Sequence, residues 1–277
     1  MAVLQTAIVA RLRAAGCVYA EDEARLLMAE ARSPAELAAM VDRRVAGLPL
    51  EHVLGWAEFC GARVALDPGV FVPRRRSEFL VAEAAALALG RVEGDGVRRE
   101  ADRGRGPVVV VDLCCGSGAV GAAVAAAVNG VEVVGVDVDP VAVRCARRNL
   151  PDGRVFEGDL YEPLPASLRG RVDVLVANAP YVPTAAVGLL PPEARTYEPR
   201  VALDGGADGL QVVRRVADGA ASWLTPGGHL LVETSADQAR AAAEAFVLGG
   251  LVPRVARSEA LDATVVIGTW PDRPVSG

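Results

Sequence analysis

The tetrapeptide NAPY at residues 178–181 follows an apolar run and carries groups that can bind a planar amide. An amide nitrogen is a weak nucleophile because its lone pair is delocalised into its carbonyl, so a site that modifies it must hold both N–H groups. The Asn178 side-chain oxygen and a main-chain carbonyl just after it can accept those two hydrogen bonds. Pro180 biases Ala179 towards an extended conformation, and Tyr181 can pack on the planar group. Taken alone, the tetrapeptide is explained equally well as the end of a strand.

A glycine-rich turn, DLCCGSGAVG at residues 112–121, lies between a predicted strand and a predicted helix. Gly116 and Gly118 let the backbone turn tightly and approach a ligand, and the helix that follows presents free N–H groups. Asp137 ends the next predicted strand, where its carboxylate can accept hydrogen bonds from ribose hydroxyls. Asp159, after the third strand, suits an adenine amino group, although an ordinary loop acid explains it equally well. The combination predicts an adenosine-containing cofactor, and it describes NAD sites too.

Strands must alternate with helices to bring these residues to one edge of a sheet, and from residue 107 the sequence does alternate. Helices are expected at 119–128, at 140–149 and around 207–224, and a turn at 225–228 precedes the fifth strand. The predicted strands are 107–114, 131–138, 154–160, 171–179, 229–235, 251–258 and 263–270. We therefore predict an α/β fold with a doubly wound, seven-stranded, mainly parallel sheet. The last two strands lack a helix between them, so they should pair as a hairpin and make one strand antiparallel.

The first part of the chain differs in character. Residues 1–50 repeat apolar positions at helical spacing and are expected to form a small helical domain. Ser33 is a predicted N-cap, with Pro34 at the first helical position and Glu36 three residues after the cap. Residues 51–76 favour strands and turns, which predicts a β-hairpin linker between this unit and the rest.

Residues 77–277 are expected to form the cofactor-binding domain. It begins with a helix at 77–90. The stretch at 90–106, GRVEGDGVRREADRGRG, is polar, charged and rich in glycine, so we expect a flexible insert there.

The overall composition narrows the classes of function. Five irregularly spaced cysteines suit a reduced, cytoplasmic protein, and His52 and His229 are the only histidines, which argues against a multi-histidine metal centre. The longest apolar runs are far shorter than the ~20 residues needed to cross a bilayer, so no membrane span is expected. The net charge of −6 weighs modestly against a surface that wraps nucleic acid.

Several motifs together resemble one known family. DLCCGSGAVG, VDVDP, GDLYEPL and NAPYVP resemble the motifs of class I S-adenosylmethionine methyltransferases, and specifically of those that methylate the side-chain amide of glutamine in peptide-chain release factors. RRVAGLPLEHVLGWAEFCG, FVPRRRSEFLV, YEPRVALDGGADGL and LTPGGHLLVE resemble further blocks of that family. The order and spacing of these blocks, across roughly residues 43 to 235, make the resemblance more specific than any single motif.

The resemblance implies S-adenosylmethionine as cofactor and a protein glutamine, in the Gly-Gly-Gln loop of a release factor, as acceptor. The acceptor residues would be Asn178, Ala179, Pro180 and Tyr181. The residues that would hold the cofactor are Cys114, Gly116, Ser117, Gly118, Asp137, Asp159, Leu160 and Asn178. We expect a monomeric enzyme with a protein partner, without a bound metal, a stable nucleic-acid complex or a membrane attachment.

Three features depart from that family's pattern. The usual Asn-Pro-Pro-Tyr is Asn-Ala-Pro-Tyr, which keeps the main-chain carbonyl of Ala179 but loses the rigidity of a proline ring. A Pro-Arg-Pro-Glu-Thr-Glu-like segment is replaced by PRRRSE at residues 73–78, which changes the charge beside the site. The N-terminal helical unit, which helps to bind the protein substrate, is shorter. The reaction type therefore carries over more safely than the substrate.

Three other functions share parts of this pattern. A methyltransferase acting on an exocyclic amino group of rRNA or DNA faces the same geometric problem, but residues 1–80 carry ten Arg against ten acidic residues and so form no basic stripe. A nicotinamide oxidoreductase would share the glycine-rich turn and Asp137 but leave residues 178–181 unexplained. A non-catalytic cofactor-binding partner would explain the departures as lost chemistry.

Overall fold

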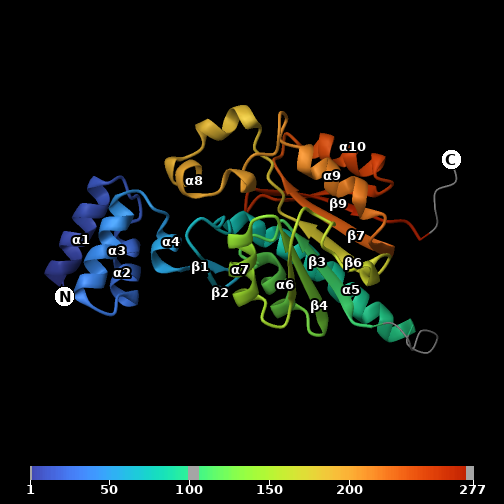
Figure 1. The fold of residues 1–277 in the computed structure, drawn as a ribbon, viewed down its shortest axis with the longest axis horizontal. Helices are drawn as coiled ribbons and strands as arrows, with labels where there is room; N and C mark the ends of the chain where they lie inside the picture. Colours follow the sequence, from blue (N-terminus) through green and yellow to red (C-terminus); the bar gives the residue numbers. More distant parts are fainter. Residues whose placement is uncertain (1, 99–105, 273–277) are drawn as a thin grey trace.

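The computed structural model describes residues 2–98 and 106–272 and contains a seven-stranded sheet in the order β5-β4-β3-β6-β7-β9-β8 (Figure 1). The strands are β3 Val108–Leu113, β4 Val131–Asp137, β5 Arg154–Glu157, β6 Val172–Ala177, β7 Leu224–Thr234, β8 Val252–Ser258 and β9 Ala263–Thr269. β5, β4, β3, β6 and β7 are parallel, and β9 is antiparallel to β7 and to β8. The predicted doubly wound α/β sheet with its antiparallel closing hairpin is confirmed.

Helices cover both faces of this sheet (Figure 1). Val108 and Val110 of β3 pack in a core with α5, α6 and α7, whereas Val109 and Val111 pack in a core with α9 and α10. The continuous valine run of β3 follows from this two-sided burial. The helices are α5 Glu78–Arg98, α6 Ala119–Ala127, α7 Pro140–Asn149, α8 Pro192–Tyr197, α9 Gln211–Ala220 and α10 Ala239–Leu248. The sequence analysis assigned no helix to the α10 segment.

Local sequence signals explain where two of the helices begin. Asp139 caps α7, because its side chain accepts a hydrogen bond from the Val141 N–H at 2.8 Å. Ser33 caps α3 in the same way, accepting from the Glu36 N–H at 3.1 Å. The Glu36 carboxylate in turn accepts from the Arg32 N–H, so the unpaired N–H groups at this helix start are satisfied from both sides.

The predicted turn at residues 225–228 lies inside strand β7 instead. β7 runs from Leu224 to Thr234, and its register against β6 shifts between Val172 and Val174. A β-bulge tolerates a proline and glycines within a strand, because the regular hydrogen-bond pattern between the two strands is already interrupted there. The turn prediction was therefore wrong, although it correctly marked an irregular backbone.

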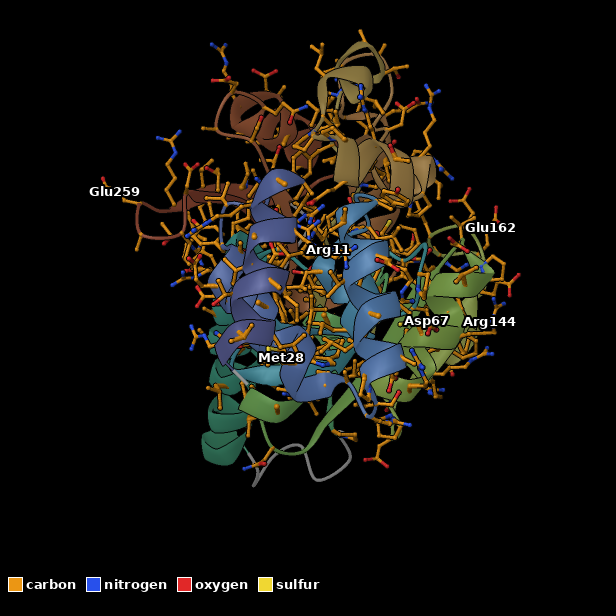
Figure 2. The ribbon with its side chains drawn as sticks, turned by 90° about the vertical axis from the view of Figure 1, so that its left-hand side faces the viewer. Arg11, Met28, Asp67, Arg144, Glu162 and Glu259 are labelled. Carbon is orange, nitrogen blue, oxygen red and sulfur yellow. The ribbon has the colours of Figure 1, made fainter. Side chains whose placement is uncertain are left out.

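A helical unit precedes the sheet and lies at one end of the molecule (Figures 1 and 2). It comprises α1 Ala2–Ala14, α2 Ala20–Glu30, α3 Pro34–Val45 and α4 Leu50–Leu54. These helices share an apolar core that includes Leu12, Leu27 and Val41. The hairpin of β1 Trp56–Phe59 and β2 Ala62–Ala65 follows, and it packs against α7. None of the helices in residues 2–98 or 106–272 is long and apolar enough to cross a membrane.

Helix α5 extends into the stretch expected to be a flexible insert. It continues to Arg98, while residues 99–105 of that stretch lie outside the described residues. The guanidinium of Arg91 binds the Asp173 carboxylate at 3.1 Å and donates to the Pro226 carbonyl at 3.1 Å. These contacts hold this turn of α5 against the sheet, which the polar composition did not reveal.

Four short 3₁₀-helices complete the fold of residues 2–98 and 106–272. They are η1 Arg75–Ser77, η2 Ala166–Leu168, η3 Thr184–Leu189 and η4 Arg200–Ala202. Two of them matter for the site. η1 lies within the PRRRSE segment, and η4 lies in the long connection between β6 and α9.

Candidate active site

The glycine-rich turn leaves β3 and enters α6 through three left-handed residues, Cys114, Gly116 and Gly118. Gly116 has φ +55°, and a Cβ built there would meet no atom within 4 Å. Gly118 has φ +77° and caps α6; a Cβ there would lie 3.1 Å from the Ala146 and Leu150 side chains. Gly118 therefore permits close packing of α6 on α7, whereas Gly116 leaves open space beside the turn.

Asp137, at the end of β4, holds this turn in place. Its Oδ2 accepts a hydrogen bond from the Gly116 N–H at 2.8 Å, and its Oδ1 accepts from the Asp139 N–H at 2.9 Å. Burial raises the pKa of the Asp137 carboxyl, and these N–H groups oppose the rise. Each carboxylate oxygen has a further lone pair, so Asp137 can still accept a hydrogen bond from a ligand hydroxyl.

Asp112 is a second carboxyl at the same place, and the sequence analysis did not single it out. It is 1% exposed at the end of β3, and its Oδ2 accepts from the Gly121 N–H at 2.9 Å. Burial raises the pKa of Asp112 to about 7, the Gly121 N–H opposes the shift, and the neighbouring Asp137 adds to it. A signal for Asp112 was present in the sequence, because it is the first residue of the DLCCGSGAVG motif.

A first cavity of about 240 Å³ lies over these strand ends. Of the predicted cofactor residues, Gly118 alone does not line it, since it faces α7. Asp159 forms an ion pair with Arg215 at 2.7 Å on its rim, with both side chains about half exposed. Those that line the cavity are Cys114, Gly116, Ser117, Asp137, Asp159, Leu160 and Asn178.

Asn178 follows β6 and lines this cavity. Its amide Nδ2 donates a hydrogen bond to the Ser77 hydroxyl at 3.2 Å. Ser77 belongs to the PRRRSE segment and is 1% exposed. No residue in the described part of the chain donates to Asn178 Oδ1, so Ser77 orients the amide and leaves its oxygen available to a ligand.

The Tyr181 hydroxyl is held by a buried carboxylate at the end of β7. It donates to Glu233 Oε1 at 3.3 Å, and the same oxygen binds Arg76 at 3.3 Å. The Arg76 guanidinium also lies 5.8 Å from the centre of the Tyr181 ring. Burial and, after it, the Glu233 charge raise the pKa of Tyr181 to about 12, so its hydroxyl stays protonated at neutral pH.

A glycine-rich loop before α9 packs closely against the backbone of the tetrapeptide at residues 178–181. A Cβ on Gly205 would lie 2.6 Å from the Pro180 carbonyl oxygen, and one on Gly209 would lie 2.2 Å from the Tyr181 carbonyl oxygen. Gln238 Nε2 donates to that Tyr181 oxygen at 2.9 Å. Larger residues at either glycine would push the loop away, so the DGGADGL sequence serves to position the tetrapeptide.

A second cavity of about 630 Å³ adjoins the first. The two share four wall residues: Phe71, Asn178, Pro180 and Ala202. The second cavity is assembled from segments far apart in the sequence. Its other lining residues are Pro49, Glu51, Arg74, Arg76, Ala179, Tyr181, Val182, Leu190, Pro191, Glu193, Ala194, Glu198, Leu203, Leu261 and Asp262.

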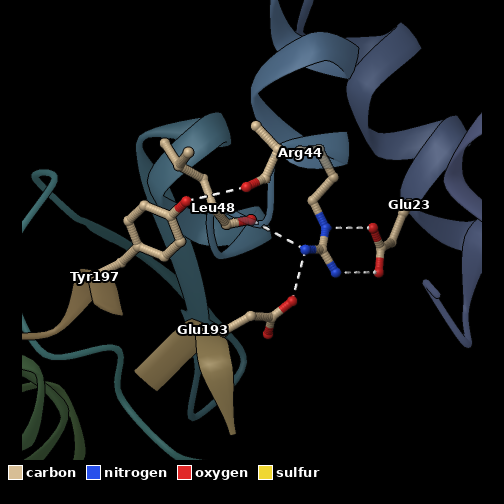
Figure 3. A network of polar contacts seen from close by, with 6 residues as sticks. Glu23, Arg44, Leu48, Glu193 and Tyr197 are labelled. Atoms are coloured by element: carbon tan, nitrogen blue, oxygen red, sulfur yellow. Dashed lines mark hydrogen bonds and ion pairs between the residues drawn. The ribbon is translucent and has the colours of Figure 1, made fainter. Parts of the chain in front are cut away.

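A buried arginine joins the helical unit to the wall of the second cavity (Figure 3). Arg44, 8% exposed, binds both carboxylate oxygens of Glu23, at 2.6 and 3.1 Å. It also binds Glu193 of α8 at 2.6 Å and the Leu48 carbonyl at 3.0 Å. Tyr197 of α8 donates to the Ala46 carbonyl at 3.0 Å. The helical unit and the wall formed by α8 are thus held together.

Comparisons with known proteins extend this description. Residues 103–189 match the family described as the Methyltransferase small domain. A release factor glutamine methyltransferase of Geobacter sulfurreducens is 40% identical over 214 residues, which make up 75% of this chain and 69% of that protein. The chain belongs to the release factor glutamine methyltransferase family. Because the chain belongs to this family, it is a methyltransferase and not a nicotinamide oxidoreductase, the alternative that the glycine-rich turn alone left open.

One further relative and one solved structure are also similar to this chain. A 4-amino-L-phenylalanine/4-methylamino-L-phenylalanine methyltransferase of Streptomyces pristinaespiralis is 37% identical, covering 70% of this chain and 63% of that protein. The solved T. thermophilus 16S rRNA N2 methyltransferase (RsmC), in complex with AdoMet and guanosine, has a TM-score of 0.50 and 23% identity. That comparison covers 77% of this chain and 49% of the RsmC chain, and it shows that the fold is shared.

Proposed function

We propose that the protein transfers a methyl group from S-adenosylmethionine to the side-chain amide nitrogen of a glutamine in a peptide-chain release factor. One observation carries the proposal beyond family membership. Asn178 lies where the first and second cavities meet, and Ser77 holds its amide so that its oxygen is left for a substrate. Because release factors act in translation, the proposal includes a cytoplasmic location.

The first cavity fits S-adenosylmethionine. Its open space above Gly116, where a Cβ would meet nothing, gives a ligand access to the turn. Asp137 keeps lone pairs for ribose hydroxyls, and Asp159 and Leu160 line the part of the cavity assigned to adenine. The cofactor supplies an electrophilic methyl group on a sulfonium, and the protein's part is to hold an acceptor nitrogen beside it.

In the second cavity, Asn178 Oδ1 and the Ala179 carbonyl accept the two N–H groups of the acceptor amide. This arrangement fixes the plane of the amide and aims its nitrogen at the first cavity. Fixing two reactants in this way removes much of the entropic barrier of a bimolecular step. Ala179 in place of the usual proline still provides its carbonyl, and the loop at Gly205 packs closely against the carbonyl of the next residue, Pro180.

The protein substrate would enter through the second cavity. We assign residues 1–50 to substrate binding, since Arg44 joins them to the α8 wall of that cavity, and residues 77–277 to cofactor binding and transfer. The hairpin within residues 51–76 links the two parts. Its Ala65 is hydrogen-bonded to Asn149, whose amide also donates to the Ser117 carbonyl of the glycine-rich turn at 2.8 Å.

The test is mass spectrometry of a purified release factor after incubation with the protein and S-adenosylmethionine. We expect one added methyl mass on the glutamine of its Gly-Gly-Gln loop. Asn178→Ala should lower turnover by about 100-fold or more, because the amide is no longer oriented, with unchanged cofactor affinity in calorimetry. The exposed Asn129→Ala is the matched control. Full turnover by Asn178→Ala would remove the assigned role, and cofactor binding without any methylation would favour a non-catalytic partner.

A second candidate function is N-methylation of a small aromatic amine. The Streptomyces pristinaespiralis relative favours it, because its name describes such an acceptor. An aromatic amine also has two N–H groups and a delocalised lone pair, so the same pair of acceptors could hold it. Adding 4-amino-L-phenylalanine to parallel reactions tests this: methylation of the amine without methylation of the release factor would favour the second candidate.

A further inference from the structure

Glu198 is a buried carboxylate with one unused oxygen. Its side chain is 1% exposed. Its Oε1 accepts hydrogen bonds from the Val72 N–H at 3.2 Å and from Arg74 at 2.5 Å. Its Oε2 is buried and has no hydrogen-bond partner among the residues that the structure describes. A buried acceptor without a donor is costly, so this oxygen calls for a partner from outside the chain.

The position of Glu198 suggests which partner that is. The residue lines the second cavity, as do Arg74, which binds it, and Asn178. Burial raises the pKa of the Glu198 carboxyl, while Arg74 and the Val72 N–H oppose the rise. A hydrogen-bond donor that enters the second cavity would therefore relieve an unfavourable burial at the place where the acceptor peptide is expected.

We propose that Glu198 Oε2 accepts a hydrogen bond from a main-chain N–H of the substrate peptide, next to the acceptor glutamine. The inference rests on the proposed function, since it names how the same site binds its protein. Asn178 and Ala179 already account for both N–H groups of the glutamine side chain. The remaining donors of a Gly-Gly-Gln segment are its main-chain N–H groups, because glycine has no side chain to offer.

A neutral donor fits Glu198 better than a cationic one. Arg74 already places a positive charge on Oε1, and Arg76 lines the same cavity. A lysine or arginine of the substrate at Oε2 would face both guanidinium groups and would have to lose its own hydration. A single N–H satisfies Oε2 without adding a charge, so a main-chain amide fits this position better than a cationic side chain.

The first experiment compares wild type with Glu198→Gln in methylation of an intact release factor. Glutamine keeps the size of the side chain and an oxygen for Arg74, but it can place an NH₂ group where Oε2 was. We expect KM for the release factor to rise about tenfold, as expected for loss of a hydrogen bond to a charged group. Both kcat and the cofactor Kd should stay within about twofold of wild type.

The second experiment begins with wild type, so its main result does not depend on the folding of a variant. Gly-Gly-Gln peptides are prepared with one main-chain amide at a time replaced by an ester, which removes that N–H. At one position next to the glutamine, the ester should weaken binding to wild type about tenfold. The same ester should cost Glu198→Gln less than about twofold, because the partner of that N–H is already gone.

Glu244→Gln is the matched control, because it makes the same chemical change on the exposed surface of α10, where Glu244 pairs with Arg240. Its KM, kcat, cofactor Kd and response to the ester peptides should all equal those of wild type. An unchanged KM in Glu198→Gln, or an ester scan without a sensitive position, would overturn the inference while leaving the proposed function intact. No methylation of the release factor by wild type would overturn the proposed function and this inference together.

Discussion

The two cavities that meet at Asn178 are built in different ways. The first is formed largely by consecutive motifs between residues 112 and 160, which lie at the ends of adjacent parallel strands. Its main carboxylates, Asp112 and Asp137, accept hydrogen bonds from nearby backbone N–H groups. The second cavity draws its walls from segments between residues 49 and 262. More than half of the residues that line the first cavity thus come from one stretch of the chain, whereas the second cavity draws on segments throughout the fold.

The charges that support the second cavity are paired by side chains instead. Arg74 binds Glu198, Arg76 binds Glu233, and both carboxylates are at most 2% exposed. Arg44 binds Glu23 and Glu193 at the junction with the helical unit. Removing one partner of such a buried pair leaves an uncompensated charge, so the second cavity should be the more sensitive of the two to single substitutions.

The largest effect is expected from Arg44→Ala. The substitution leaves Glu23, whose side chain is 10% exposed, without its cation, so the free energy of unfolding should fall by about 3–5 kcal/mol. It also removes the Arg44–Glu193 ion pair between the helical unit and α8, so KM for the release factor should rise while the cofactor Kd in the folded protein is unchanged. Urea unfolding and calorimetry measure the two quantities.

Arg11→Ala is the control for this prediction, because Arg11 pairs with Asp42 in the same helical unit but both side chains are about half exposed or more. We expect it to change the free energy of unfolding by no more than about 1 kcal/mol. If the cofactor Kd of Arg44→Ala rose by as large a factor as its KM for the release factor, cofactor binding and substrate binding would not depend on two separate cavities.

A smaller effect, confined to the first cavity, is expected from Asp112→Asn. The pKa of Asp112 is about 7 in the folded protein against 3.8 for an unperturbed carboxyl, so between these values the folded state binds more protons than the unfolded state. Wild type should therefore lose stability as pH rises through this window, by up to about 4 kcal/mol. Asparagine can still accept from the Gly121 N–H but does not ionise.

Urea unfolding of both proteins at a series of pH values from 4 to 8 checks this. The difference in free energy of unfolding between variant and wild type should grow with pH and level off above about 7. The pH dependence of KM for the release factor should be the same in the variant and in wild type. A pH-independent difference would show that another group, and not Asp112, carries the shift.

The smallest effect is expected from Ser77→Ala, at the boundary between the cavities. It removes the hydroxyl that orients Asn178, a hydrogen bond of 3.2 Å that should contribute about 1 kcal/mol. We expect kcat to fall about fivefold with the cofactor Kd unchanged. Ser77→Thr keeps a hydroxyl and should restore kcat, whereas the exposed Ser222→Ala should have no effect. Equal loss in the alanine and threonine variants would indicate a packing role for Ser77.

Part of the site was predictable because short-range signals determine it. Gly116, Asp137 and Asn178 each lie at or just after the carboxyl end of a predicted strand, and parallel strands end at one edge of a sheet, so their meeting in one cavity follows from strand order. Their individual roles stay predictions. The cap residues Ser33 and Asp139 were likewise readable, because each bonds within three residues of itself.

Apart from Asp112, the residues missed by sequence reasoning bind partners far along the chain. Ser77 and Asn178 are 101 residues apart, Arg74 and Glu198 are 124 apart, and Arg76 and Glu233 are 157 apart. In the sequence, the arginines of PRRRSE indicated only a change of charge beside the site. Nothing in periodicity or turn chemistry shows which carboxylate each would meet.

The sequence by itself determined the alternating sheet, the glycine-rich turn and the order of the motifs, because these depend on side-chain period, backbone φ and caps over a few residues. Only the tertiary structure decided that PRRRSE lies against residues 178–181, that Glu198 and Glu233 are buried beside it, and that α8 joins Arg44. The physical reason is desolvation. A charge acquires a large energetic consequence only when folding removes water from it, and which charges lose water depends on how distant segments pack.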